Sequence, residues 1–120
     1  MGYMDISICG SDNAAAMLSN ISQAVVKELK KEIKKKDNEF NTDGIVNVAL
    51  FFEEVIIKAK NLFIYEDEIV ALAKKTCEGL DNLIDEAKKV SDTEWDSKDY
   101  HIKRYSELRK KIKKWIKDIG

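Results

Sequence analysis

Apolar residues recur at spacings of three and four along the first third of the chain, which is the pattern of an amphipathic helix. The pattern begins after Ser11 and ends among the lysines near Lys36. Its members are Ala14, Leu18, Ile21, Val25, Leu29 and Ile33. We therefore predict a first helix that packs this stripe into a core. The stretch that follows, as far as Gly44, is rich in Asn and Asp, and it predicts a turn in which Asn41 or Thr42 caps the next helix.

Segment 45–60 is apolar on more than one side. One stripe consists of Ile45, Ala49, Phe52, Ile56 and Ala59, and a second stripe beside it of Val46, Leu50 and Ile57. A helix that is apolar on more than one side is expected to be largely buried. The β-branched residues would also suit a strand, but the length of the segment and its charged interruptions favour a helix. We therefore predict that this second helix is the most buried one.

Two further segments, 66–90 and about 97–119, keep helical spacing. Acids in the first turn of the third helix suit its dipole. The apolar face of the fourth helix is close to a coiled-coil seam and consists of His101, Tyr105, Leu108, Ile112, Trp115 and Ile119. Four helices joined by short loops predict an all-α fold. We expect a compact bundle of about four helices with a short extended N-terminal segment, forming a single domain over residues 1–120.

Composition agrees with long helices, because the chain has no proline, only five glycines and 36% charged residues. The two cysteines, Cys9 and Cys77, match no metal-type spacing and are expected to be reduced thiols. Neither a secretory signal nor an apolar run long enough to span a membrane is present. We therefore expect a soluble cytoplasmic protein without a cofactor or a membrane contact, present as a monomer or a homodimer.

The opening stretch GYMDISICGSDNAAAML, residues 2–17, mixes acids and hydroxyls with small residues. Ser11 directly precedes the first helix, and Asp12 and Asn13 occupy its first turn, where their oxygens suit the exposed amide hydrogens. Alternatively, Asp5, Ser7, Asp12 and Asn13 converge as oxygen ligands for a cation, together with an acid of the second helix such as Glu53. The spacing matches no known calcium loop, so helix capping is the favoured interpretation.

The same opening resembles an uncharacterised bacterial family, a domain of unknown function. Its members begin with a Gly-aromatic turn and continue with an Asn/Asp-rich helix start, paired alanines and an apolar residue. The matching residues are Gly2, Tyr3, Ser11, Asp12, Asn13, Ala14, Ala15 and Leu18. The chain departs from the family pattern in lacking an early aromatic-Gly pair and in having Ala16 where the family has an acid. The resemblance covers under a fifth of the chain and implies no catalytic residue.

Glu53 falls on the second apolar stripe of segment 45–60. A carboxylate in such surroundings must find a partner or take up a proton. A raised pKa would suit general acid or base chemistry, although no second reacting group is evident. The favoured interpretation is a boundary residue that bonds Tyr3, Tyr65 or a lysine. The single histidine, His101, is expected to be an edge residue with a hydrogen-bond partner.

Charge is unevenly placed along the chain. Residues 61–97 hold ten acids and four bases, a net charge of −6, whereas residues 98–120 hold nine bases and three acids, a net charge of +6. Cations surround the apolar seam of the last helix, and those that we predict to bind a partner are Arg104, Lys110, Lys111, Lys113, Lys114 and Lys117. The alternative is a solvated face whose lysines neutralise the acids of the third helix.

The sequence contains no catalytic constellation and no phosphate-binding glycine motif. It therefore favours a non-enzymatic bacterial or phage-type protein that binds another protein, as an inhibitor or immunity-like factor does, through a charged helical surface. One alternative is a nucleic-acid-associated factor that uses the basic last helix, with Trp115 or Tyr105 stacking on bases if they are exposed. The overall net charge of −1 argues against nucleic-acid binding. A metal-binding domain of unknown activity is a further alternative.

Overall fold

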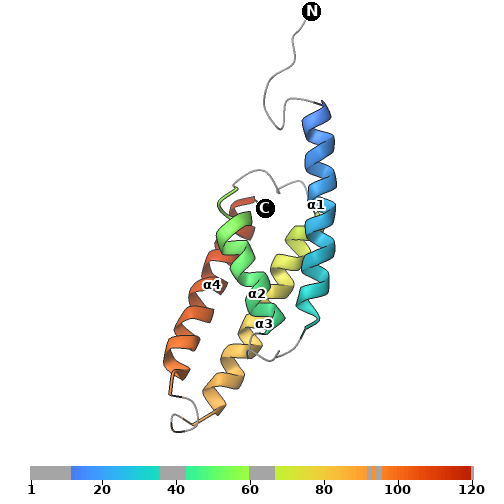
Figure 1. The fold of residues 1–120 in the computed structure, drawn as a ribbon. Coiled ribbons are helices and arrows are strands. Elements are labelled where there is room, and N and C mark those ends of the chain that lie inside the picture. Colours follow the sequence, from blue (N-terminus) through green and yellow to red (C-terminus); the bar gives the residue numbers. More distant parts are fainter. Residues whose placement is uncertain (1–11, 36–42, 60–66, 92, 94–95, 120) are drawn as a thin grey trace, which may run out of the picture.

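The computed structural model of this protein describes residues 12–35, 43–59, 67–91, 93 and 96–119 (Figure 1). Its helices are α1 (Asp12–Ile33), α2 (Gly44–Phe51), α3 (Asp67–Lys89) and α4 (Lys98–Ile119), and α2 continues into one π-helical turn, η1 (Phe52–Ile56). The predicted all-α bundle is confirmed. The predicted extended N-terminal segment lies outside the described residues. None of the described helices combines the length and the apolar content needed to cross a membrane.

The helices pack around one core. α3 and α4 run antiparallel and contact each other more extensively than any other pair, while α2 and η1 lie against both (Figure 1). α1 packs on α2 and α3, and its N-terminal half projects beyond the ends of the other helices (Figure 1). This projection leaves part of α1 without cover from the described helices.

The second helical segment lies at the centre, as predicted. Val48, Ala49, Phe52 and Ile56 are completely buried, and the edge of the Phe52 ring faces Trp115 of α4 with 5.7 Å between ring centroids. The core is completed by further buried residues of the other helices, among them Leu29, Ile69, Leu80, Leu108 and Ile112. Burial of this apolar area is the main contribution to the stability of the bundle.

The second apolar stripe of this segment is covered only in part. Leu50 is 36% exposed, and Val46 and Ile57 are half-buried. The prediction of a largely buried helix therefore holds best for the first stripe, while the second stripe keeps partial contact with water. Glu53, by contrast, is buried as its position predicted.

The π-helical turn was not predicted. The amide of Ile57 donates to the carbonyl oxygen of Phe52 at 2.9 Å, five residues earlier. Such turns are rare and occur often at functional sites. This π-helical turn includes the buried residue Glu53, so it lies where a carboxylate is placed at the edge of the core.

The start of α2 is fixed by Asp43 and Gly44. Asp43 caps the helix, because its Oδ1 accepts a hydrogen bond from the Ile45 amide at 2.8 Å. The predicted caps, Asn41 and Thr42, lie outside the described residues, and the predicted assignment is wrong by one or two positions. A Cβ at Gly44 would collide with the carbonyl oxygen of Glu32, so only glycine allows α2 to begin this close to the end of α1.

The predicted core stripe of α1 is buried only towards its C-terminal end. Leu29 and Ile33 belong to the core, whereas Leu18 and Val25 are half-buried and Ile21 is 46% exposed. The helical spacing was predicted correctly, but the expectation that the whole stripe is buried is wrong. The reason is the projection of the N-terminal half beyond the bundle.

Cys77 of α3 is a free thiol buried between α3 and α4. Its Sγ lies 4.0 Å from the carbonyl oxygen of Arg109. Burial raises the pKa of this thiol, because the interior disfavours the charged thiolate. Cys9 lies outside the described residues.

Candidate functional site

The basic helix α4 turns one face to the core and the opposite face outwards. Leu108, Ile112 and Trp115 are buried against the other helices. On the opposite side, exposed lysines recur at intervals of seven, four and three residues and thus form one stripe. We call Lys103, Lys110, Lys114 and Lys117 the outer lysine stripe of α4.

The outer lysine stripe carries positive charge that no described acid neutralises through an ion pair. Among the described residues, neither its four lysines nor the neighbouring Lys113 form an ion pair. The α3 acid Asp81 pairs instead with Arg109. The alternative in which these lysines neutralise the acids of the third helix is therefore not seen in the direct contacts of the described residues.

Two other predicted partner-binding residues, Arg104 and Lys111, contact Glu53 instead of projecting freely. The Arg104 guanidinium donates to both Glu53 oxygens, at 2.9 Å from Nη1 and 2.5 Å from Nη2. Lys111 Nζ donates to Glu53 Oε2 at 2.7 Å. Such a two-pronged contact fixes the orientation of the carboxylate as well as its charge. The three residues link η1 to α4, and we call them the Glu53 cluster.

The Glu53 cluster keeps the carboxylate ionised. The side chain of Glu53 is only 9% exposed, and burial alone would raise its pKa. The hydrogen bonds from Arg104 and then from Lys111 outweigh this effect and lower the pKa to about 2. The alternative of a raised pKa is therefore wrong, and Glu53 is unsuited to donate a proton near neutral pH.

The favoured interpretation of Glu53 as a bonded boundary residue is confirmed through Lys111. Tyr3 and Tyr65, the other partners considered, lie outside the described residues. The contact with Arg104 was missed, because 51 residues separate it from Glu53 and no local pattern connects two such distant positions. One pattern in the sequence could have predicted this contact. Glu53 is an acid on an apolar stripe, and Arg104 is a cation next to the apolar seam of the last helix.

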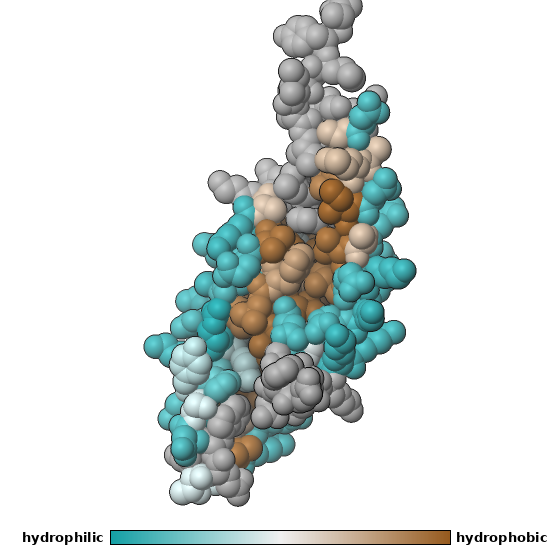
Figure 2. All heavy atoms as spheres, viewed as in Figure 1, coloured by the Kyte–Doolittle hydropathy of each residue, from teal (hydrophilic) through white to brown (hydrophobic). Residues whose placement is uncertain are grey.

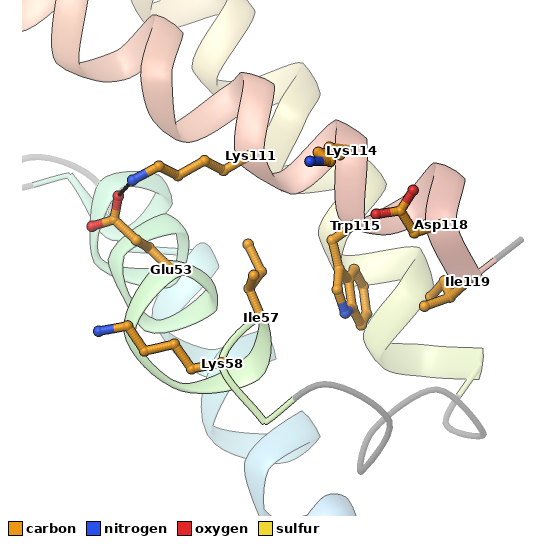
Figure 3. Close-up of a pocket in the computed structure, with 8 residues that line it drawn as sticks. All are labelled: Glu53, Ile57, Lys58, Lys111, Lys114, Trp115, Asp118 and Ile119. Atoms are coloured by element: carbon orange, nitrogen blue, oxygen red, sulfur yellow. Dashed lines mark hydrogen bonds and ion pairs between the residues drawn. The ribbon is translucent and has the colours of Figure 1, made fainter.

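A cavity of about 600 Å³ lies beside the Glu53 cluster, between the end of η1 and the last turns of α4 (Figure 3). Ile57 and Trp115 provide apolar walls, and Lys114 and Asp118 come from α4 (Figure 3). The indole N–H of Trp115 is buried and has no acceptor among the described residues. Lysine and carboxylate side chains also line this cavity, so it offers an apolar surface with charged edges.

Neither aromatic residue considered for base stacking is fully exposed. Trp115 is buried against Phe52, and Tyr105 is half-buried beside His101. His101 is an edge residue whose Nδ1 lies 2.8 Å from the carbonyl oxygen of Ser97, which confirms the prediction that it has a hydrogen-bond partner.

The weak metal candidates do not form a metal centre in the described part of the chain. Asp5 and the side chain of Asp12 lie outside it, and Asn13 is exposed on the first turn of α1. The carboxylate of Glu53 already accepts hydrogen bonds from the side chains of Arg104 and Lys111. Over the residues that the structure describes, no group of three or more His, Cys, Asp and Glu side chains is placed to hold a metal ion.

No protein-family model, curated protein or solved structure matches this chain. The resemblance of the N-terminal residues to an uncharacterised bacterial family stays a prediction.

Proposed function

We propose that this chain is a non-enzymatic protein-binding domain of the inhibitor or immunity type, and that it binds an acidic partner through α4. Lys110, Lys113, Lys114 and Lys117 supply the direct contacts in this proposal. Arg104 and Lys111 have a supporting role in this proposal, since both donate hydrogen bonds to Glu53 and are not available for direct contacts.

The observation that carries the proposal is the outer lysine stripe. Its cations are exposed, lie along one side of one helix and have no ion-pair partner among the described residues. A single-sign stripe raises the association rate with a partner of opposite charge, and salt weakens this effect. The packing of α4 against α3 and η1 supports the proposal, because a surface that is already folded before binding loses less entropy on binding.

The test begins with capture from an extract of the native cell. The full chain and the variant Lys110→Glu/Lys114→Glu are immobilised side by side at about 50 mM salt, where surface charge is weakly screened. We expect an acidic protein that the native chain retains and the variant does not. Identical sets of retained proteins would overturn the proposal for α4.

The retained protein is then purified and its association rate is measured against both chains. We expect the variant to associate about tenfold more slowly at low salt, and the difference to shrink as salt rises. The variant Lys74→Glu/Lys75→Glu on α3 provides the matched control, because it makes the same change of charge on a neighbouring helix. An equal effect of the control would mean that net charge, and not the stripe, determines the rate.

The same stripe suits a nucleic-acid backbone, which is the second candidate. Titration with labelled single- and double-stranded DNA at about 50 mM salt distinguishes the two, because phosphate binding weakens steeply as salt rises. Tight, salt-sensitive DNA binding that Lys110→Glu/Lys114→Glu abolishes would favour this candidate over an acidic protein. Burial of Trp115 removes the stacking contact that single-strand binding commonly uses.

A further inference from the structure

Apolar side chains gather on the face of the molecule that α1 and α2 form (Figure 2). Among the described residues of α1, the large hydrophobic side chains with the greatest exposure are Met17 at 52% and Ile21 at 46%. A contiguous exposed apolar patch is characteristic of a surface that another molecule covers.

The patch surrounds a groove of about 460 Å³ between α1 and α2. Ile21, Ala24 and Val25 line it from α1, and Val48 and Phe51 line it from α2. The two helices are antiparallel, since Asn47 near the start of α2 donates to Glu32 near the end of α1 at 2.8 Å. The groove therefore opens towards the projecting N-terminal half of α1.

The projecting half of α1 continues this apolar surface. Ala14, Met17, Ile21 and Ala24 follow one another at spacings of three, four and three, which places them on one stripe of the helix. A short helical segment is only marginally stable in water without packing. A surface that packs against this stripe would therefore stabilise the helix over residues 12–22.

The order of residues in this stripe is the same in both directions: a small residue, two large residues and a small residue. We propose that the groove and the projecting half of α1 bind a second copy of this chain, with the two α1 helices antiparallel. In this register Met17 of each copy faces Ile21 of the other, and Ala14 faces Ala24. A two-fold axis then passes between the two helices, so both copies bury the same patch and the assembly closes as a dimer.

Shape and charge favour a second copy in this register. The N-terminal half of α1 projects beyond the other helices (Figure 1). In the proposed antiparallel pair, the two bundles therefore lie at opposite ends of the overlap. The start of the second α1 then reaches the groove beside Phe51. The alanines at both ends of the overlap allow the helices to approach closely, and the three-four spacing is that of paired helices. The first charged residue along the stripe, Glu28, lies beyond the overlap.

The extent of the overlap sets the expected strength of the dimer. From Ala14 to Ala24 the helix rises about 15 Å. This contact covers less than the roughly 800 Å² on each partner that is typical of a stable interface. We therefore expect a reversible dimer with a Kd in the micromolar range.

The first test is sedimentation equilibrium of the full chain from about 1 to about 500 µM, a range that brackets a micromolar Kd. We expect the native chain to pass from monomer to dimer, and Ile21→Glu to weaken dimerisation at least tenfold. Gln23→Glu is the matched control, because it adds the same charge at an exposed position of α1 away from the stripe. A monomer at every concentration, or equal loss in both variants, would overturn the proposal.

The second test addresses the register. Met17→Lys and Ile21→Glu each weaken the dimer alone, but the double variant brings Lys and Glu of opposite copies together in the proposed antiparallel register. We expect it to recover at least tenfold over Ile21→Glu. In a parallel pair, like charges would meet and the double variant would not recover. Circular dichroism of each variant confirms the fold, which these half-exposed positions leave intact.

Discussion

The C-terminal half of α1 packs into the core, whereas the N-terminal half of the same helix projects from the bundle with comparable apolar spacing. Leu29 and Ile33 are buried between α2 and α3, but Met17 and Ile21 are exposed by about half. The two halves show that periodicity determines which residues share a face, while the length of the neighbouring helices determines whether that face is covered. Covered and uncovered apolar positions should therefore respond very differently to substitution.

The largest effect is expected at the centre of the covered region. Phe52 is completely buried and packs against Trp115. Phe52→Ala should lower the free energy of unfolding by about 3 to 5 kcal/mol, because it removes a buried ring and leaves a cavity. Urea denaturation measures the loss. A loss below about 1 kcal/mol would show that the second helix is not the centre of the core.

The direct comparison within α1 comes next. Leu29→Ala should lower the free energy of unfolding by about 2 to 3 kcal/mol, since Leu29 belongs to the core. Ile21→Ala should cost under about 1 kcal/mol in the monomer, because half of its side chain is already in water. Both variants are measured by urea denaturation at low protein concentration. Equal losses would mean that the projecting half is covered within a single chain.

Two neighbouring glutamates provide the corresponding comparison for charge. Glu53→Gln should lower the free energy of unfolding by about 2 kcal/mol, since it leaves Arg104 and Lys111 without their carboxylate; these cations are partly exposed, so the loss stays below that of a fully buried pair. Glu54→Gln removes only the exposed pair with Lys58 and should cost under about 1 kcal/mol.

The same contrast predicts a dependence on pH. The pKa of Glu53 is about 2 in the folded protein, against the ordinary value of 4.5. The cluster therefore stabilises the fold fully above pH 4.5, and this contribution is lost as the pH falls towards 2. Unfolding measured at several pH values should show a shallower decline between these limits for Glu53→Gln than for Glu54→Gln. If the free energy of unfolding of the two variants fell equally with pH, the lowered pKa of Glu53 would be contradicted.

The smallest effect is expected on the outer face of α4. Lys110→Glu/Lys114→Glu should change the free energy of unfolding by less than about 1 kcal/mol, because neither lysine forms an ion pair among the described residues. A thermal denaturation scan checks this. A larger loss would reveal a structural role for the stripe and would weaken its assignment to partner binding.

The helices could be predicted from sequence because each apolar stripe is a local pattern, and all four were placed within a few residues of their observed ends. The uncovered state of Ile21 could not, because it depends on where other helices stop. The contact of Glu53 with Arg104 could not be predicted either, because it depends on how η1 packs on α4. The π-helical turn depends on a backbone hydrogen bond from Ile57 to Phe52, which spans five residues and not the usual four. The candidate surface on α4 was predicted from charge, but which of its cations are engaged needed the tertiary structure.

The buried thiol of Cys77 makes the interface between α3 and α4 accessible to kinetic measurement. A thiol reacts as the thiolate, and burial both raises its pKa and blocks the reagent. In a Cys9→Ser background, the rate of labelling at Cys77 therefore reports how often the two helices separate, on a timescale slower than side-chain motion. Comparing this rate with that of global unfolding would reveal whether the pair opens by itself or only when the whole bundle comes apart.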